Sequence, residues 1–338
     1  MSVLLTGGTG YIGSHTAVEL LDAGYDVVLA DDLSNSEESV VGRIERICGK
    51  RPLFYKADVK DRGVLGRIFS ENDIEAVIHF AGFKAVGESV SEPLMYYRNN
   101  LDTAISVLET MKETGCRRFI FSSSATVYGM NNTVPFREDM PRSSTNPYGT
   151  TKLMIEMIME DLCRSDGTFS CVALRYFNPV GAHPSGLIGE KPSGVPNNLT
   201  PYIQQVASGI REKLYVFGND YDTPDGTGVR DYIHVTDLAA GHLCAMKYSS
   251  DHPGFLAVNL GTGTGYSVLE MVRAFEKVNG VKIPYEISPR RPGDIASCYA
   301  DVTRAKQLLG WQAEKGLEDM LRDAWNWEKN RTGRQDNE

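Results

Sequence analysis

The chain has 338 residues, enough for one large domain or two domains of ordinary size. Its 35 basic and 44 acidic residues give a net charge of −9, which argues against a general affinity for nucleic acid or a membrane surface. We find no apolar run near the roughly 20 residues that span a bilayer and no secretory leader, and six cysteines without paired metal spacing predict reduced thiols, a cytoplasmic location and no bound metal.

Short apolar runs alternate with helical patterns through the first half of the chain. A helical pattern from Ile12 to Ala23, for example, ends at Gly24. This alternation predicts an α/β fold, a Rossmann-type doubly wound parallel sheet with helices on both faces. The expected strands are Val3–Thr6, Val27–Ala30, Leu53–Ala57, Val77–Phe80, Phe119–Ser122 and Cys171–Arg175.

After about residue 178 the alternation breaks into loops that are rich in proline and glycine. We therefore expect a first domain over residues 1–177 and a smaller mixed α/β domain over residues 178–338, built at the carboxyl edge of the sheet. Residues 232–246 and 256–260 carry regular patterns again, so some later segments are expected to return to the first domain.

The stretch "TGGTGYIG" follows the first expected strand and opens the first helix. Gly7, Gly10 and Gly13 have the spacing of a dinucleotide-binding loop, in which glycines permit a tight turn, approach of the backbone to a pyrophosphate and close helix packing. A plain glycine turn is the alternative. Asp31, at the end of the second strand, favours the dinucleotide, because its carboxylate can accept hydrogen bonds from ribose hydroxyls and repel a 2′-phosphate. NAD is therefore expected in preference to NADP.

Polar residues end other strands as well. Asp58 ends the third strand and could contact the adenine or only support a turn, whereas Asp32 could simply be solvated. We expect His79 to be a packed strand residue and not a catalytic base. Serines in "FSSSATVYG" end the fifth strand, at the edge where ligands bind in this architecture.

Tyr148 and Lys152 lie four residues apart in "NPYGTTK", at an expected helix start. This spacing places both side chains on one face of the helix. A nearby ammonium lowers the pKa of a phenol, which would suit Tyr148 to act as a base. Ser124 would add a hydroxyl from the fifth strand.

A serine and a Tyr-x-x-x-Lys pair behind an NAD loop are the arrangement of the short-chain dehydrogenase/reductase superfamily, and the chain resembles its extended branch. A closer resemblance, to the UDP-galactose 4-epimerase family, covers residues 2 to about 327. It implies an isomerase that binds NAD in the first domain and a UDP-sugar in the second, oxidises C4 transiently to a 4-keto sugar, and returns the hydride to the other face. The blocks that carry it are "TGGTGYIGSHTAVELL", "HFAGFKAVGESV", "FIFSSSATVYG", "LRYFNPVGAHPSG", "PNNLTPYI", "FGNDYDTPDGTGVRDYIHV" and "RRPGD".

The resemblance also implies roles by position. Tyr148 would take the proton of the sugar 4-hydroxyl, Lys152 would bind the nicotinamide ribose and lower the phenol pKa, and Ser124 would hydrogen-bond the same sugar oxygen. Beside these three, the implied NAD contacts are Gly7, Gly10, Tyr11, Ile12, Gly13, Asp31, Asn35, Ser36, Asp58, Val59, Phe80, Ala81, Lys84, Asn99 and Phe177. The implied UDP-sugar contacts are Asn178, Asn198, Leu199, Phe217, Arg230, Arg291 and Asp294. Asp32 departs from the family pattern, which often has asparagine there.

The arginines agree with this implication. Arg230 follows a glycine-rich loop and Arg291 lies in "RRPGD", and two arginines are what an acidic protein needs to hold a diphosphate. The alternative is that they form ion pairs with Asp231, Asp237 or Asp294.

Cys298 stands where family members restricted to UDP-glucose and UDP-galactose tend to carry a tyrosine. A thiol leaves room for a 2-acetamido group, so the resemblance implies that UDP-GlcNAc and UDP-GalNAc are substrates too. Two alternatives remain: Cys298 is an ordinary small core residue, or a one-residue shift puts Tyr299 at this position.

The helix after Tyr148 has apolar residues at 153, 154, 155, 157, 158, 159 and 162, too many for one core-facing stripe. Either the helix is enclosed by the sheet and loops, or a second face is buried in a homodimer, which the resemblance implies.

Other functions remain open. A nucleotide-sugar 4,6-dehydratase typically has an acidic pair after the active-site serine or threonine, where this chain has Ala125 and Thr126. A non-catalytic NAD-binding regulator would usually lack the tyrosine or the lysine. A net oxidoreductase is formally possible.

Overall fold

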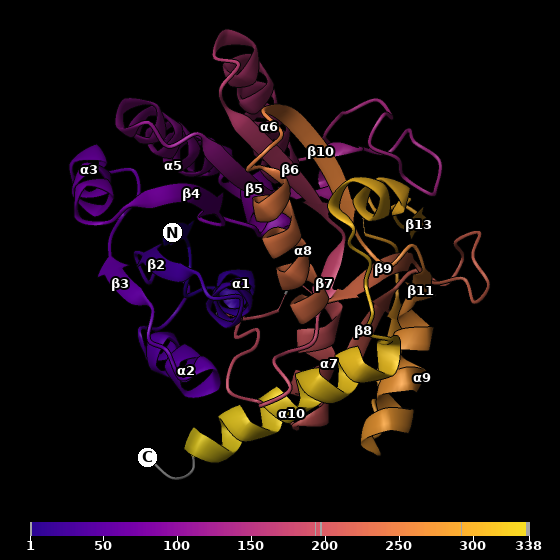
Figure 1. The fold of residues 1–338 in the computed structure, drawn as a ribbon. Helices are drawn as coiled ribbons and strands as arrows, with labels where there is room; N and C mark the ends of the chain where they lie inside the picture. The colour runs from indigo at the N-terminus through magenta and orange to yellow at the C-terminus, as the bar shows by residue number, and fades with distance from the viewer. Residues whose placement is uncertain (1, 193, 197, 292, 336–338) are drawn as a thin grey trace.

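The computed structural model describes residues 2–192, 194–196, 198–291 and 293–335. Two sheet-containing regions lie side by side, with the amino-terminal half around the larger sheet and the carboxyl-terminal helix α10 (Leu317–Gln335) running beneath both (Figure 1). None of the helices in the described ranges combines the length and the apolar character that crossing a bilayer requires.

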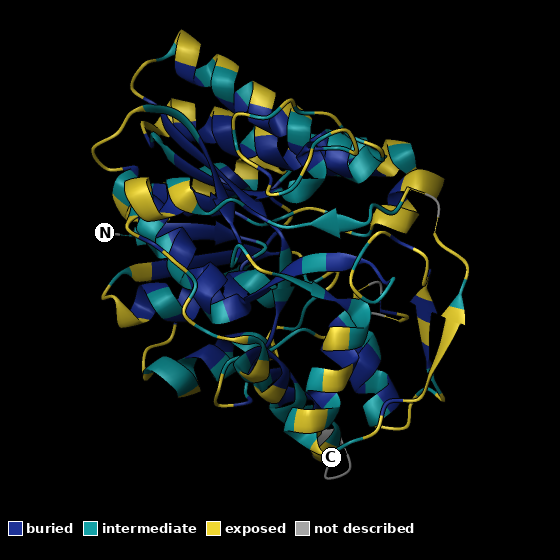
Figure 2. Cartoon of the chain, turned by 90° about the vertical axis from the view of Figure 1, so that its right-hand side faces the viewer, coloured by how far each residue is buried: buried dark blue, intermediate teal, exposed yellow. Residues whose placement is uncertain are grey.

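The larger sheet has seven parallel strands in the order β10-β6-β5-β4-β1-β2-β3. Its inner strands are almost entirely buried, as Figure 2 shows, because helices cover both faces, whereas the edge strand β3 has no buried residue. The predicted Rossmann-type doubly wound sheet is therefore confirmed. The strands are β1 (Ser2–Thr6), β2 (Asp26–Asp31), β3 (Leu53–Lys56), β4 (Ile74–His79), β5 (Arg118–Ser124), β6 (Ser170–Tyr176) and β10 (Gly254–Leu260).

Alternate side chains of each strand enter different apolar clusters. Leu5 of β1 packs toward α1 (Tyr11–Asp22), α2 (Ser39–Cys48) and α8 (Val235–Tyr248). Leu4 packs toward α3 (Arg62–Glu71), α5 (Pro93–Thr114) and α6 (Pro147–Ser165) on the other face. The short helix α4 (Val86–Ser91) precedes α5, and Gly24 (φ +88°) follows the end of α1 as predicted.

The strand order reverses between β1 and β4. From β1 the chain winds outward to β2 and β3, then returns to β4 on the other side of β1 and continues to β5 and β6. The loops that leave the carboxyl ends of β1 and β4 therefore diverge, which opens the crevice where ligands bind in this architecture. This reversal of strand order determines where the site residues lie.

The second region holds a smaller mixed sheet in which β9 (Val229–His234) pairs with β7, β11 and β13, beside a two-stranded sheet of β8 and β12. Its core includes Ile203, Phe275 and Leu321, one from each of the three helices around it. These elements are β7 (Asn178–Val180), α7 (Leu199–Ala207), β8 (Leu214–Phe217), β11 (Gly265–Ser267), α9 (Val268–Asn279), β12 (Tyr285–Ser288) and β13 (Ser297–Cys298). A 3₁₀ turn (Ala125–Val127) and a π-helical turn (Ala305–Leu309) complete the described elements.

Segments from beyond residue 177 also pack in the first region. Strand β10 pairs with β6 at the edge of the large sheet, and α8 lies in the same core as α1. The preceding strand, β9, belongs to the smaller sheet. The division of the chain at residue 177 stays a prediction.

Candidate active site

The expected cofactor residues gather at one edge of the large sheet. Most of them follow the carboxyl ends of β1 to β6, and Asn99 comes from α5. Because the strands are parallel, these ends meet along the same edge. Besides Asn99, the residues are Gly7, Gly10, Tyr11, Ile12, Gly13, Asp31, Asn35, Ser36, Asp58, Val59, Phe80, Ala81, Lys84, Ser124, Tyr148, Lys152 and Phe177.

The glycine loop has no room for side chains. Gly7 has φ +69°, and a Cβ there would lie 2.8 Å from the backbone nitrogen of Ala81. A Cβ on Gly13 would lie 2.5 Å from the carbonyl oxygen of Gly7, so α1 packs directly on the loop. Gly10 is the N-cap of α1 and has no side chain to cover the helix end. The first-turn amides and the helix dipole thus favour an anion here.

The carboxylate of Asp31 is fixed by three donors. The backbone nitrogen of Thr9 donates to one oxygen at 3.1 Å, and the backbone of Leu33 and the hydroxyl of Ser36 donate to the other at 3.0 and 2.9 Å. Leu33 has φ +63°, a conformation that non-glycine residues rarely adopt. The carboxylate retains lone pairs for a further donor such as a ribose hydroxyl.

Lys60 joins two of the expected cofactor residues. Its Nζ lies 3.4 Å from an oxygen of Asp58 and donates to the Asn99 side chain at 3.0 Å. Asp58 also accepts from the backbone nitrogen of Lys60, as a turn carboxylate does. Lys60, two residues after Asp58, was not among the predicted site residues.

Asn100 is a second residue that the sequence argument missed. It is buried in α5, accepts from the backbone nitrogen of Phe83 at 2.8 Å, and donates to the carbonyl of Phe83 and to the hydroxyl of Thr151, both at 3.1 Å. It therefore ties the loop after β4 to α6, beside Lys152. Its position four residues after the buried Tyr96 was an available signal, because a polar residue on a core-facing helix stripe needs partners.

Tyr148 lies in the first turn of α6 and faces Ser124 at the end of β5. Asn146 caps this helix, as predicted, by accepting from the backbone nitrogen of Gly149 at 2.9 Å. Burial raises the pKa of Tyr148 above its ordinary value, while a hydrogen bond with Ser124 and the charge of Lys84 act in the opposite direction. That Lys152 lowers this pKa, as the family resemblance implies, stays a prediction.

Lys152 is buried beneath the tyrosine ring. Its Nζ donates to the carbonyl of Ser122 at 2.6 Å and lies 4.7 Å from the ring centroid of Phe121. Burial lowers the pKa of Lys152 to about 7. His79, nearby, is a packed strand residue. Its ring nitrogen lies 2.7 Å from the hydroxyl of Thr6, and burial lowers its pKa to about 3.

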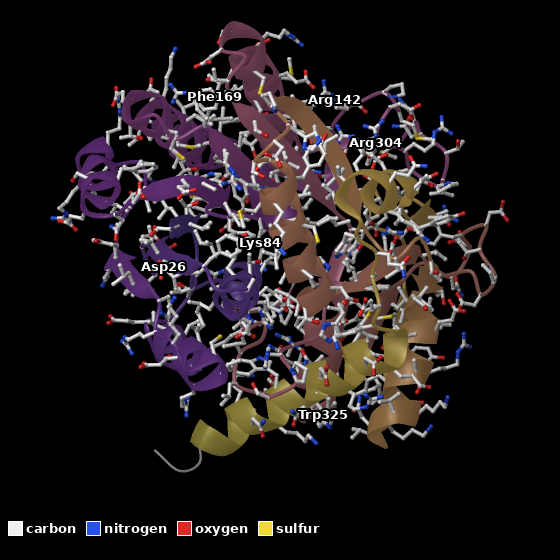
Figure 3. All side chains as sticks on the ribbon, in the orientation of Figure 1. Asp26, Lys84, Arg142, Phe169, Arg304 and Trp325 are labelled. Carbon is white, nitrogen blue, oxygen red and sulfur yellow. The ribbon has the colours of Figure 1, made fainter. Side chains whose placement is uncertain are left out.

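Lys84, labelled near the middle of the view in Figure 3, contacts an oxygen of Glu190 through its Nζ at 2.9 Å. The same oxygen accepts from the side chain of Asn198 at 3.2 Å. Tyr11 donates to the carbonyl of Gly181 at 2.7 Å. Glu190 therefore joins an expected cofactor residue to an expected substrate residue, and the sequence argument did not identify it.

The two expected diphosphate arginines converge on Asp294. Arg291 donates to it at 2.9 Å, and Arg230 approaches its other oxygen at 3.5 Å. Arg291 also lies over the ring of Phe217, 5.0 Å from its centroid. Arg290 is separate, since it pairs with Asp220 at 2.7 Å.

Two of the proposed alternative partners of the arginines bind main chain instead. Asp231 accepts from the backbone of Thr262, Gly263 and Ala300. Asp237 accepts from two consecutive backbone nitrogens before α10. The third alternative partner, Asp294, does form ion pairs with Arg230 and Arg291 in the structure.

Cys298 pairs with Arg230 through β13 and β9, and its side chain packs with the cluster that contains Phe136 and Phe177. Burial raises the pKa of its thiol to about 12. Tyr299 points the other way, because its ring lies beside Gly265. Asn178 begins β7, while Asn198 and Leu199 begin α7 on the same side of the site.

Similarity to known proteins agrees with this geometry. The family model of GDP-mannose 4,6 dehydratase matches residues 4–324. A UDP-glucose 4-epimerase of Bacillus subtilis is 58% identical over 97% of both chains.

Two solved structures have the same fold. A UDP-glucose 4-epimerase from Stenotrophomonas maltophila, with bound NAD and formylated UDP-arabinopyranose, is 49% identical with a TM-score of 0.97 and covers 99% of both chains. The enzyme from Bifidobacterium longum, in complex with NAD+ and UDP, is 52% identical with a TM-score of 0.95 and covers 98% of this chain and 99% of its own. The chain belongs to the UDP-glucose 4-epimerase family, within the extended short-chain dehydrogenase/reductase superfamily.

Proposed function

We propose that this protein is an isomerase that interconverts UDP-galactose and UDP-glucose at C4, with NAD as its bound redox cofactor. One observation of the structure supports this best. The phenol of Tyr148 hydrogen-bonds Ser124 above the buried Lys152, at the sheet edge where the glycine loop ends. Relatives more than 50% identical over nearly the whole chain are UDP-glucose 4-epimerases.

The residues present fit a dinucleotide. The N-terminus of α1 offers backbone donors for the pyrophosphate, and the glycines beside it leave space that a Cβ would fill. Asp31 would accept from the adenosine ribose, and Asp58 and Asn99 lie on the same side. A bound NAD would supply the acceptor for a hydride from C4 of the sugar and the donor for its return to the opposite face.

The side chains divide the proton chemistry among them. Tyr148 would take the proton of the 4-hydroxyl at its phenolic oxygen and give it back at the end of the cycle. Ser124 would hydrogen-bond the same sugar oxygen and hold it in line. Lys152 would bind the nicotinamide ribose while its ammonium stays beneath the phenol ring.

The second region would hold the nucleotide and leave the sugar free to turn. Arg230 and Arg291 would exchange part of their contact with Asp294 for the diphosphate, a geometry suited to guanidinium groups. Asn178 and the start of α7 line the same side. An uncharged 4-keto sugar held only through its diphosphate could present either face for the returning hydride.

A 4,6-dehydratase is the second candidate, because the matching family model carries that name. Elimination of water from C5 and C6 needs an acid and a base near the sugar. Ala125 and Thr126, in the turn after Ser124, supply neither. The epimerase is therefore the better proposal.

Incubation of the purified protein with UDP-galactose, without added NAD, tests the proposal. An epimerase that carries its cofactor produces UDP-glucose until the two sugars reach equilibrium, with no net change in NADH absorbance. A 4-keto-6-deoxy product would support the dehydratase. A stoichiometric rise in NADH would indicate a net oxidoreductase, and an unchanged sugar would favour a non-catalytic regulator.

We further propose that UDP-GlcNAc and UDP-GalNAc are substrates. Cys298 faces the cluster that includes Phe177, while Tyr299 points toward Gly265. A thiol at this position occupies much less volume than a phenol and would leave room beside the sugar 2-substituent. Turnover of UDP-GlcNAc at concentrations that saturate with UDP-glucose would support this extension.

We also propose a homodimer in the cytoplasm. Large apolar side chains of α4 to α6 are exposed, among them Val90 on α4, Leu94 on α5, and Met154 and Met157 on α6. Leu94 is 81% exposed and Met157 is 50% exposed. Ile155 and Met159 of α6 are buried in the core, so α6 has apolar side chains on two faces. Light scattering at micromolar concentration would test the homodimer, and a result that shows only monomer would count against it.

The proposed cytoplasmic location is supported by the six cysteines, which are free thiols and suit a reducing compartment.

A further inference from the structure

Glu190 lies where the cofactor and substrate sides of the site meet. One of its carboxylate oxygens contacts Nζ of Lys84 at 2.9 Å and accepts from Nδ2 of Asn198 at 3.2 Å. Its side chain is only 10% exposed. A carboxylate with so little access to water depends on such partners for its stability.

The backbone around Glu190 is held rigidly from the other side. The indole nitrogen of Trp327, on α10, donates to the carbonyl of Glu190 at 3.0 Å. Gly189 lies directly on the same indole, because a Cβ there would be 2.5 Å from the ring. A bridge between Ala182 and Gly189 closes the loop before Glu190. The backbone that carries the carboxylate is thus held against α10 through Trp327.

The backbone next to Lys84 is also held in place by hydrogen bonds. The neighbouring Phe83 exchanges two backbone hydrogen bonds with the buried amide of Asn100. Asn100 also donates to Thr151 of α6, three residues after Tyr148, so the loop that carries Lys84 is held against the helix that carries the phenol. The charge of Lys84 acts to lower the pKa of Tyr148. Because 55% of the Lys84 side chain is exposed, water screens part of this interaction.

We propose that Glu190 is a positioning residue of the epimerase, which holds Lys84 beside Tyr148, offsets part of its charge, and anchors Asn198 of the substrate-binding segment. This inference rests on the proposed function. Glu190 touches neither of the atoms that exchange protons in the reaction, and it acts on the phenol through Lys84.

Other titratable groups also surround the phenol, one from each element packed against it. Tyr96 of α5, which donates to Glu88 of α4, and Tyr176 of β6 both have pKa values raised mainly by burial and further by the charge of Tyr148. The charged residues whose substitution would change the electrostatic environment of the phenol are therefore Lys84, Lys152 and, acting through Lys84, Glu190.

Glu190→Gln separates the charge of this residue from its contacts. The amide oxygen can still accept from Lys84 and Asn198, but the negative charge is gone. The positive charge of Lys84 then acts on Tyr148 without compensation, so the phenolate is favoured. We expect the acid limb of kcat/KM for UDP-galactose to move to lower pH, on the order of 0.5 to 1 unit. KM at the optimum should change little.

A matched control removes a charge far from the site. Glu318 pairs with Lys277 at 2.8 Å on the surface, so Glu318→Gln makes the same change in net charge and should leave the pH profile unmoved. In a Lys84→Met background, Glu190→Gln should no longer shift the acid limb, because its intermediary is absent. Glu190→Ala, which also removes the acceptor for Asn198, should raise KM by more than Glu190→Gln does.

These outcomes separate the inference from the proposed function. If the wild-type protein has no epimerase activity, the proposed function fails. If it is active and Glu190→Gln leaves the acid limb in place, or shifts it equally with and without Lys84, the inference about Glu190 is wrong while the proposed function stands.

Discussion

The ammonium of Lys152 lies over the Tyr148 ring, 5.7 Å from its centroid. Its hydrogen bond goes to the carbonyl of Ser122, at the end of β5. The two side chains share a helix face because they are four residues apart, but the strand decides where the ammonium points. Lys152 therefore links the helix that carries the phenol to the strand that carries Ser124.

Tyr148→Phe removes the phenolic oxygen and keeps the ring. We expect turnover of UDP-galactose to fall by roughly 10²- to 10⁴-fold, the usual contribution of a general base. Because the ring still packs, the melting temperature and the bound NAD should be close to those of the wild type. Steady-state kinetics and thermal unfolding measure both, and near-native turnover would remove Tyr148 from the role of base.

Lys152→Met keeps most of the side-chain volume and removes the cation. Without the cation the phenolate is less favoured, so the phenol pKa rises and the acid limb of the rate profile moves to higher pH. The shift has the opposite sign to that expected for Glu190→Gln. The pH dependence of kcat/KM is the measurement, and a slower enzyme with an unmoved profile would leave Lys152 only a binding role.

Cys298→Tyr tests the sugar pocket. A phenol beside the sugar 2-substituent should lower kcat/KM for UDP-GlcNAc by at least about tenfold, through steric exclusion, and spare UDP-glucose. Cys298→Ser is the matched control, since it changes the side-chain chemistry without adding bulk. Equal losses on both sugars would show that Cys298 is a packing residue and does not select the substrate.

Arg175 supports the active site from inside the core. It is 1% exposed and makes two hydrogen bonds to the buried Glu156 of α6, at 3.0 and 2.8 Å, and Glu156 also accepts from Ser123 at 2.6 Å. Arg175→Met would leave this carboxylate with the hydroxyl of Ser123 and the longer contact of Arg142, at 3.2 Å.

Loss of one partner from a buried ion pair costs about 3 to 5 kcal/mol. We expect Arg175→Met to lower the free energy of unfolding by an amount in that range, measured by denaturant titration of the holoenzyme. The double variant Arg175→Met/Glu156→Leu should recover much of the loss, because no charge then remains buried alone. If Arg175→Met is as stable as the wild type, the pair contributes nothing to holding α6.

Local patterns were sufficient for much of the fold. The first six strands, the end of α1 before Gly24 and the Asn146 cap of α6 each depend on residues a few positions apart, where periodicity and capping preferences operate. The glycine spacing indicated a loop without room for a Cβ, which the approach of Gly13 to Gly7 explains. The family resemblance supplied the roles of the individual site residues, and these roles remain predictions.

Only the tertiary structure decided which distant residues meet. Glu190 contacts Lys84 across 106 positions, and Asn100 reaches Thr151 across 51, and no local period carries such information. The same holds for the partners of the charged groups: Asp231 binds backbone amides while Asp294 holds two arginines. The sequence alone determined the first six strands, the end of α1 and the Asn146 cap because these depend on short-range sterics and hydrogen bonding. The charge environment of Tyr148 was decided by folding, because burial and the arrival of Lys84 at the phenol exist only once the chain is packed.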